Sequence, residues 1–279
     1  MSPEAFAGDP LTPPVVWDRQ LAAKGPGRKL RVGYFDYDGF FGAAPPCKRA
    51  VADAVARMKA AGHTVVPFDP PQGYRAAMTF YGLMSSDGRM RSFIEGLEGE
   101  NLHSSYAKLH TLSRIPTAVK SLLCPVLRVA GQKRPADLMA VAGAKSAYDF
   151  WQCVADRKEI QQAWMQAIAD ADLDVIICPG GALPAYPHGA AGELSASCSY
   201  TFLFNLLHFP AGTVPFTRIR AGEERYEDEW NDLWTKKAAA VMEGSAGLPI
   251  GVQVVGLPFK EELVLHAMLE VEKCQDKDA

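Results

Sequence analysis

The chain has 279 residues, with 48% hydrophobic residues, 22% charged residues and a formal net charge of −3. These values are typical of a globular protein that buries a sizeable core in one large domain or two small ones. The small negative charge gives no sign of nucleic-acid binding, so we expect no nucleic-acid partner. The six cysteines are scattered without a Cys-x-x-Cys pair, which indicates reduced, mostly buried thiols in a cytosol-facing protein.

The opening of the chain carries no secretory signal, because no basic start is followed by an apolar run. Pro10, Pro13 and Pro14 interrupt any helix there, and we expect residues 1–29 to form an irregular lead-in. No uncharged apolar stretch reaches about 18 residues, so no transmembrane helix is expected. The opening has the character of the middle of a chain more than of the start of a domain.

Residues 30–68 predict the first structural unit. Leu30–Phe35 (LRVGYF) is a short β-prone run, and apolar residues recur at helical spacing from Pro45 to Gly62. His63–Phe68 (HTVVPF) predicts a second strand. A strand, a helix and a strand in this order favour a right-handed βαβ unit and a largely parallel sheet.

The rest of the chain changes between strand and helix patterns. Three further strands are expected at 174–178, 211–219 and 250–255, and helical segments at 72–131, 136–172, 223–241 and 261–273. The acidic residues from Glu223 to Asp232 are expected to form a solvated loop and the start of a helix. The sequence therefore predicts an α/β protein.

Common catalytic motifs are absent from the sequence. It contains no Gly-x-Ser-x-Gly elbow, P-loop, Gly-x-Gly-x-x-Gly or His-Glu-x-x-His motif. The six histidines show no metal-ligand spacing, so we expect no metal site. Without further information, the chain would be an α/β domain of unknown function.

Three segments carry a resemblance to a known family. Residues 198–217 read CSYTFLFNLLHFPAGTVPFT, residues 245–262 read SAGLPIGVQVVGLPFKEE, and residues 30–35 and 61–68 read LRVGYF and AGHTVVPF. Together they resemble the C-terminal part of the amidase-signature hydrolases, and specifically of the animal fatty-acid amide hydrolases. The resemblance implies one partial domain over residues 1–279. Its fold would be the C-terminal part of an α/β amidase-signature fold, with a mixed twisted sheet flanked by helices and an inserted helical membrane cap.

The same resemblance implies a serine amidase that hydrolyses fatty-acid amides, such as ethanolamides and primary amides, to a fatty acid and an amine. The family mechanism needs a lysine base, a bridging serine and a nucleophilic serine in a stretch of the Gly-Gly-Ser-Ser-Gly-Gly type. The sequence contains no such stretch, and by family position it would lie before Met1. Ser195, Ser197 and Ser199 have no lysine at a suggestive spacing. We therefore expect no catalytic residue in this chain and no amide hydrolysis by the isolated chain.

Position-by-position matching with the family implies an acyl channel. Its lining would be Trp234, Cys198, Phe202, Leu138, Ala142, Met84 and Ser85. The alternative is that these are ordinary core residues. Each methylene of an acyl chain that such a channel buries contributes about 0.8 kcal/mol to the binding free energy, which gives both affinity and chain-length selectivity. Ala142 and Ser85 are smaller than the family's residues, and His208 stands where the family usually has an acidic residue. The sequence therefore does not determine which acyl group the channel would take.

Residues 111–134 match the family's membrane cap and are expected to form a helix pair lying in the membrane interface. The cap residues would be Ile115, Val119, Lys120, Leu122, Leu123, Val126, Leu127 and Arg128, with Arg114, Lys133 and Arg134 as further edging cations. The alternative is a buried helix pair with snorkelling lysines.

Two other functions remain open at this point. The chain could be a catalytically inactive short form that binds lipid or pairs with a full-length relative, or it could belong to an amidase-signature enzyme for other small amides. The family precedent implies a lipid amide substrate, a membrane-surface partner and a homodimer on cytosol-facing endomembranes, with no metal or organic cofactor. A cap that does not function would instead leave the protein cytoplasmic.

Overall fold

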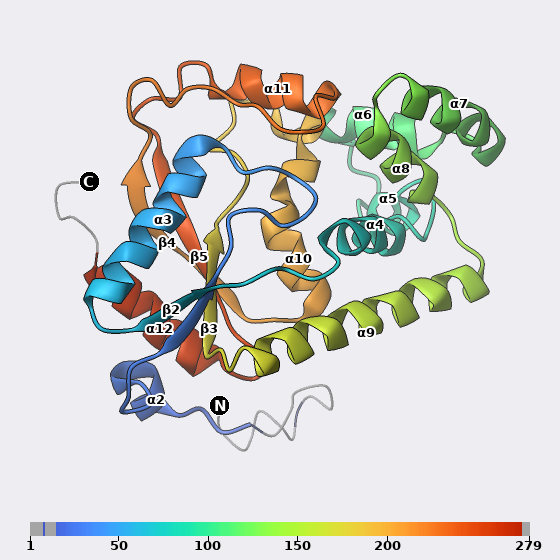
Figure 1. Ribbon diagram of the computed structural model, residues 1–279. Coiled ribbons are helices and arrows are strands. Elements are labelled where there is room, and N and C mark those ends of the chain that lie inside the picture. The colour runs from blue at the N-terminus through green and yellow to red at the C-terminus, as the bar shows by residue number, and fades with distance from the viewer. Residues whose placement is uncertain (1–7, 9–14, 275–279) are drawn as a thin grey trace.

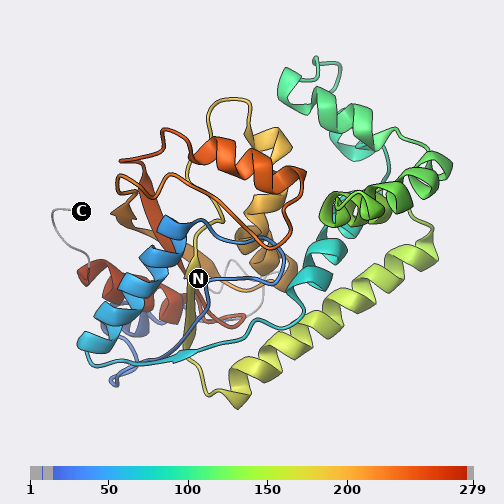
Figure 2. The same ribbon diagram turned by 45° about the horizontal axis from the view of Figure 1, so that its top comes forward.

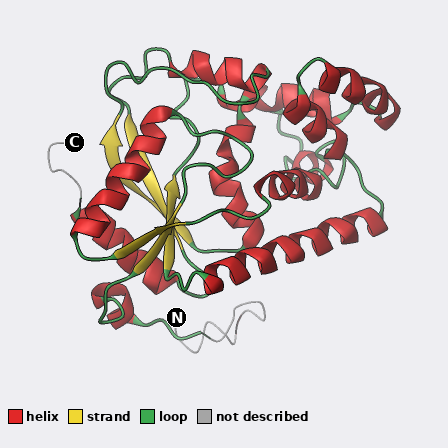
Figure 3. Ribbon diagram, viewed as in Figure 1, coloured by secondary structure: helices red, strands yellow, loops and turns green. Residues whose placement is uncertain are grey.

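The computed structural model describes residue 8 and residues 15–274, apart from the side chains of residues 105 and 108. Its centre is a five-stranded sheet in the order β2-β1-β3-β5-β4. The strands are β1 (Arg31–Tyr34), β2 (Thr64–Pro67), β3 (Val175–Pro179), β4 (Ala211–Arg218) and β5 (Pro249–Val255). Figure 3 shows these strands as one twisted layer with helices around it. The predicted α/β fold with a mixed sheet is confirmed.

The direction of the strands divides the sheet into two parts. β1 runs parallel to β2 and to β3, whereas β5 runs antiparallel to both β3 and β4. The predicted parallel βαβ unit is therefore confirmed, but a largely parallel sheet is correct only for the first three strands. Strands β4 and β5 are consecutive in the sequence and pair with each other, so the chain changes direction between them.

Burial explains which segments become strands. All five residues of β3 are buried, as expected for a continuous apolar run in the middle of a sheet. The edge strand β4 is different, because Ala211, Thr213 and Pro215 are exposed while Val214 and Phe216 are buried. This alternation is the pattern of a strand with one face on the core.

Two helices pack on the strands β3, β4 and β5. Helix α3 (Pro45–Ala60) begins with two prolines at its first positions, where the missing N–H groups have no helical partner anyway. Its buried face holds Cys47, Ala50, Val51, Ala54, Val55 and Met58. Helix α12 (Glu261–Lys273) closes the chain and lies beside β4 in Figure 1.

A helical region extends away from the sheet, as Figure 2 shows. It consists of α4 (Gly73–Met84), α5 (Arg91–Glu95), α6 (Ser104–Ser113), α7 (Thr117–Val129), α8 (Lys133–Val141) and α9 (Ala147–Asp170). The prediction of a single helix over 136–172 is wrong, because the helical conformation is interrupted between α8 and α9. Gly143 adopts a φ of 124°, a conformation that favours glycine. Ser146 then caps α9, since its hydroxyl accepts from the Asp149 N–H.

The remaining helices surround the sheet. Helix α10 (Ser199–Leu207) follows the short 3₁₀ turns η1 (Ala191–Glu193) and η2 (Ser195–Cys198), and α11 (Leu233–Met242) follows the acidic segment. In residues 15–29 of the lead-in the structure forms a helix that we did not predict, α2 (Arg19–Lys24), which packs on α12. It forms because the Asp18 carboxylate accepts from two backbone N–H groups of its first turn. Pro10, Pro13 and Pro14 lie outside the described residues.

Aromatic rings join the sheet to the helical region. Trp164 of α9 is fully buried and contacts Phe35, Phe68 and Phe204 with ring centroids 5.5–6.1 Å apart. Its indole N–H donates to the Pro71 carbonyl at 2.9 Å. This fixes α9 against the ends of β1 and β2, so the helical region starts from a rigid base.

All six cysteines are free. Cys47, Cys124 and Cys178 are buried, and Cys198 is exposed. Burial raises the pKa of the Cys47 and Cys178 thiols to about 12, which keeps both protonated.

Among the described helices, none combines the length and the low charge that a membrane span needs.

Candidate functional site

Phe202 lies in a compact group of rings between α10 and α4. Its ring stacks on Phe80 with centroids 4.2 Å apart and an interplanar angle of 6°, and Tyr81 meets it edge-on at 5.5 Å. We call Phe80, Tyr81 and Phe202 the Phe202 cluster. Matching with the family pointed to Phe202 but not to Phe80 and Tyr81. Both are adjacent aromatic residues in a predicted helical segment, shortly before the predicted channel residues Met84 and Ser85, and this was a signal that could have identified them.

The small-residue loop before α10 lies beside this cluster. The Tyr81 hydroxyl is 3.5 Å from the Ser195 hydroxyl, and burial raises the pKa of Tyr81 to about 12. The Tyr186 hydroxyl hydrogen-bonds to Ser197, and burial likewise raises the Tyr186 pKa. Both phenols therefore stay neutral at physiological pH. Cys198 occupies the N-cap position of α10 without a side-chain capping hydrogen bond, and it is exposed.

Trp234 belongs to a different group of rings at the other end of α4. It is half-buried and contacts Phe40 and Phe41 with centroids 6.1 and 6.5 Å apart. Tyr74 contacts Phe40 at 5.5 Å and Trp230 at 5.7 Å. We call these five rings the Trp234 cluster. Helix α4 carries Tyr74 at its start and the Phe202 cluster near its end, so it links the two predicted channel sites.

The other predicted channel residues lie around the ends of α4 and α8. Met84 is 69% exposed and so faces outward. The Ser85 hydroxyl accepts from the Gly143 N–H at 2.9 Å and donates to the Tyr81 carbonyl at 2.6 Å. Leu138 and Ala142, on α8 and just after it, are half-buried. Through its two hydrogen bonds to the backbone, Ser85 connects the end of α4 to the loop after α8.

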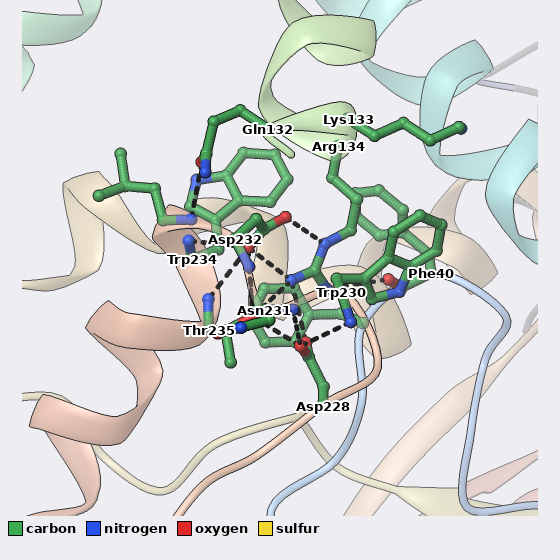
Figure 4. Close-up of polar contacts among 12 residues, drawn as sticks. Phe40, Gln132, Lys133, Arg134, Asp228, Trp230, Asn231, Asp232, Trp234 and Thr235 are labelled. Atoms are coloured by element: carbon green, nitrogen blue, oxygen red, sulfur yellow. Dashed lines mark hydrogen bonds and ion pairs between the residues drawn. The ribbon is translucent and has the colours of Figure 1, made fainter. Parts of the chain in front are cut away.

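A buried arginine anchors α8 to the segment before α11 (Figure 4). Arg134 is 0% exposed and donates through Nε and Nη2 to the two carboxylate oxygens of Asp232 at 2.7 and 2.8 Å. Asp228 lies 2.9 Å from Nη2, and Nη1 donates to the Phe40 carbonyl at 3.2 Å. Three rings of the Trp234 cluster surround the guanidinium, with Trp234 5.7 Å from its carbon.

This anchor corrects two expectations. The segment 223–232 is not simply a solvated loop, because Asp232 is fully buried and the Asp228 side chain is 5% exposed. Arg134 is likewise no exposed cation at a membrane edge. Burial works against charge on both partners, but their mutual hydrogen bonds and attraction prevail, which raises the Arg134 pKa and lowers the Asp232 pKa.

The predicted cap consists of the end of α6, all of α7 and the start of α8. Helix α7 buries Lys120 and Cys124, and Leu127 is half-buried. Its other side exposes apolar residues: Val119 (42%), Leu122 (76%), Leu123 (42%), Val126 (64%) and Val129 (91%). We call these five residues the α7 face.

Two cations of the predicted cap, Lys120 and Arg128, have partners inside the protein. Lys120 faces inward and donates to the Ala142 carbonyl at 2.8 Å, and burial lowers its pKa. Arg128 donates to Asp137 at 2.7 Å. Lys120 therefore binds the backbone at the end of α8 and does not lie at the border of an exposed face. Ile115, just before α7, is half-buried.

Ser195, Ser197 and Ser199 lie in the segment before and at the start of α10. Ser197 is fully buried and donates to the Leu194 carbonyl at 2.7 Å. Ser199 is 2% exposed and lies beside Asp38, without normal hydrogen-bond geometry. Within the described part of the chain, none of the hydroxyls of Ser195, Ser197 and Ser199 bonds to a lysine.

Two further features lie away from these residues. No three acidic, histidine or cysteine side chains in residue 8 or residues 15–274 converge to hold a metal ion. An open groove of about 470 Å³ lies between α2, the edge strand β4 and α12, where Trp17, Leu265 and Leu269 contribute apolar surface. None of the predicted channel residues lines this groove.

The fold and these residues can be compared with known proteins. Residues 8–265 match the model of the Amidase family. The chain belongs to the amidase family. Over 97% of its length it is 35% identical to "Fatty-acid amide hydrolase 1" of Sus scrofa, of which it covers 47%. Over 95% of its length it is 32% identical to "Fatty acid amide hydrolase 1" of Caenorhabditis elegans, of which it covers 46%.

A solved structure titled "Fatty acid amide hydrolase" shares the fold, with a TM-score of 0.70 and 20% sequence identity over 96% of this chain. The chain covers 44% of that structure. This amidase-family chain therefore spans about half the length of the curated relatives that it matches.

Proposed function

We propose that this chain forms the lipid-binding part of an amidase-family hydrolase that cleaves fatty-acid amides, such as ethanolamides and primary amides, to a fatty acid and an amine. The observation that carries the proposal is the α7 face, because a helix that turns five large apolar residues outward needs an apolar partner. A face of this kind suits the boundary between lipid headgroups and acyl chains. The names of the two curated relatives support an amide with a long acyl chain.

The two ring clusters would hold the acyl chain. Aromatic side chains offer large apolar surfaces with fixed geometry, and each methylene that they remove from water contributes about 0.8 kcal/mol. Phe202 and Trp234 lie near opposite ends of α4, so one extended chain could run along that helix. Cys198, Leu138, Ala142, Met84 and Ser85 would lie along the same path.

The described side chains would bind and orient the substrate and exclude water, but would not attack it. The lysine and the two serines of the family mechanism would come from polypeptide other than these 279 residues. A homodimer on cytosol-facing endomembranes belongs to the same proposal. An inactive lipid-binding form would use the same two clusters.

Vesicle flotation tests the lipid-surface part of the proposal. The double variant Leu122→Glu/Val126→Glu places two charges one turn apart on the α7 face and should reduce flotation at least about tenfold, because each buried carboxylate costs several kcal/mol. Phe259→Glu is the matched control, since Phe259 is 56% exposed and lies just before α12. Equal flotation of the wild type and the double variant would refute the α7 face as a membrane contact.

Binding of a fluorescent long-chain fatty-acid amide tests the acyl site separately. Trp234→Ala should weaken binding by about 1–3 kcal/mol, because the acyl chain loses one aromatic wall. A short amide such as acetamide should not compete. Competition by acetamide at equal concentration would favour an amidase for other small amides.

A further inference from the structure

Three consecutive residues connect the end of the α7–α8 turn to the segment 228–235. Gln132 accepts a hydrogen bond from the Leu233 N–H at 2.8 Å. The Lys133 ammonium lies 4.1 Å from the Tyr74 ring centre and 5.5 Å from that of Trp230. Arg134 then makes the buried bidentate contact to Asp232. These side chains fix the start of α8 to the start of α11 at several points (Figure 4).

The partner of Arg134 controls the first turn of α11. Asp232 is the N-cap of this helix, and its carboxylate accepts from the N–H groups of Trp234 and Thr235. The Thr235 hydroxyl accepts from the Asp232 N–H in return, which completes a capping box. Because Trp234 lies in this first turn, a shift of the Arg134 guanidinium must move either the cap or the indole.

Helices α7 and α8 form the other end of the connection. They pack along each other, and Arg128 of α7 binds Asp137 of α8 at 2.7 Å. The Gln132 N–H also donates to the Leu127 carbonyl at 2.8 Å, which closes the turn between them. A force on the α7 face therefore acts on both helices together.

The chemistry of the contact suits a positioning role better than a stabilising one. Burying one guanidinium with two carboxylates is weak support for stability, because desolvation offsets most of the attraction. The bidentate geometry is strongly directional, and lysine cannot reproduce it. The arginine thus defines one orientation of α8 relative to Trp234.

We propose that Arg134 is a positioning residue that transmits contact between the α7 face and a lipid surface to Trp234 in the acyl site. This inference rests on the proposed function for its two end points, the lipid surface and the acyl chain. Docking of the α7 face moves α7 and α8 as a unit, and Arg134 carries that movement into the first turn of α11. The affinity for the lipid amide then depends on membrane contact.

The test compares two substitutions that remove the same geometry at different places. Arg134→Lys keeps the charge but loses the fork. Arg49→Lys is the matched control, because Arg49 makes a similar fork to Glu223 at 2.6 and 3.0 Å, between α3 and the loop after β4. A third variant, Arg134→Met with Asp228→Asn and Asp232→Asn, removes all three charges and retains an asparagine N-cap, in case Arg134→Lys does not fold.

Hydrogen exchange of residues 232–242 is measured with and without vesicles of phosphatidylcholine and phosphatidylserine, together with the Kd for a fluorescent fatty-acid amide. In the wild type and in Arg49→Lys, vesicles should change both quantities at least about fivefold, which is an ordinary size for coupling between two sites. In Arg134→Lys and the triple variant, both changes should fall within about twofold while flotation persists.

Two results would overturn the inference. One is a full vesicle response in Arg134→Lys, which would leave Arg134 a purely structural clamp even if its exchange without vesicles is faster. The other is a wild type whose residues 232–242 do not respond to vesicles. If the exchange response is present but no fatty-acid amide binds, the proposed function fails and the coupling through Arg134 stands.

Discussion

Replacement of the buried Asp38 by asparagine should change how the stability of the protein depends on pH. Asp38 is 2% exposed, and its carboxylate accepts from the N–H groups of Phe40 and Phe41 at 2.8 Å each. Burial raises its pKa from 3.8 to about 6, and the Ser199 hydroxyl and these N–H groups only partly oppose the rise. The loop that Asp38 holds supports Trp234, because Phe40 and Phe41 contact that indole.

The sign follows from comparing the folded and unfolded states. The folded protein holds the Asp38 proton more tightly than the unfolded chain, so the stability from this proton is fully present below pH 3.8 and is lost as pH rises through about 6. This rise in pKa corresponds to about 3 kcal/mol, of which roughly 1 kcal/mol is lost between pH 5 and pH 8. Asp38→Asn keeps an acceptor oxygen but cannot ionise, so it lacks this loss.

Urea unfolding of both proteins at pH 5, 6, 7 and 8 measures the effect. The free energy of unfolding of Asp38→Asn relative to the wild type should rise by roughly 1 kcal/mol from pH 5 to pH 8. Asp174→Asn is a control whose difference from the wild type should stay constant over this range. Burial of Asp174 is outweighed by hydrogen bonds from Arg28 and the Arg31 N–H, which lower its pKa, so the stability that the ionised carboxylate adds is fully present above the unfolded pKa of 3.8 and is lost only at lower pH. A difference between Asp38→Asn and the wild type that is constant across this range would refute the reasoning.

Three other outcomes are expected. Phe202→Ala should lower the free energy of unfolding by about 3–5 kcal/mol, because it removes a buried ring that stacks on Phe80, whereas Phe202→Leu should lose less in the same urea assay. Arg134→Met alone should destabilise by about 3–5 kcal/mol, because Asp232 is left buried without a counter-charge; adding Asp228→Asn and Asp232→Asn should restore most of that loss. A fluorophosphonate should label no serine of this chain stoichiometrically, as read by intact mass, and labelling of Ser199 would contradict the assignment of these serines to structural roles.

Much of the fold could be predicted because its signals are local. β3 and α3 form where the sequence shows a continuous apolar run and a helical apolar repeat, and both were expected within a residue or two. The break between α8 and α9 was missed, because a single glycine at position 143 lies between helical patterns on both sides. The short helix α2 was missed because it depends on one cap, Asp18, and on packing against α12.

The candidate site was only partly predictable for a different reason. Family resemblance pointed to Trp234 and Phe202 as positions, but it could not say which rings surround them. The charged residues were interpreted from their neighbours in the sequence, so Arg134 was assigned to an exposed face and Asp232 to a solvated loop. Their contact spans 98 positions of the chain, and no local pattern reports it.

The sequence by itself determined the family and the succession of the five strands along the chain, because motifs and periodicity depend on residues a few positions apart. Only the tertiary structure decided which side of α7 faces outward and which carboxylates receive Arg134. These depend on how segments distant in the sequence meet, where the burial of a charge is tolerated only if its partner arrives in the right geometry.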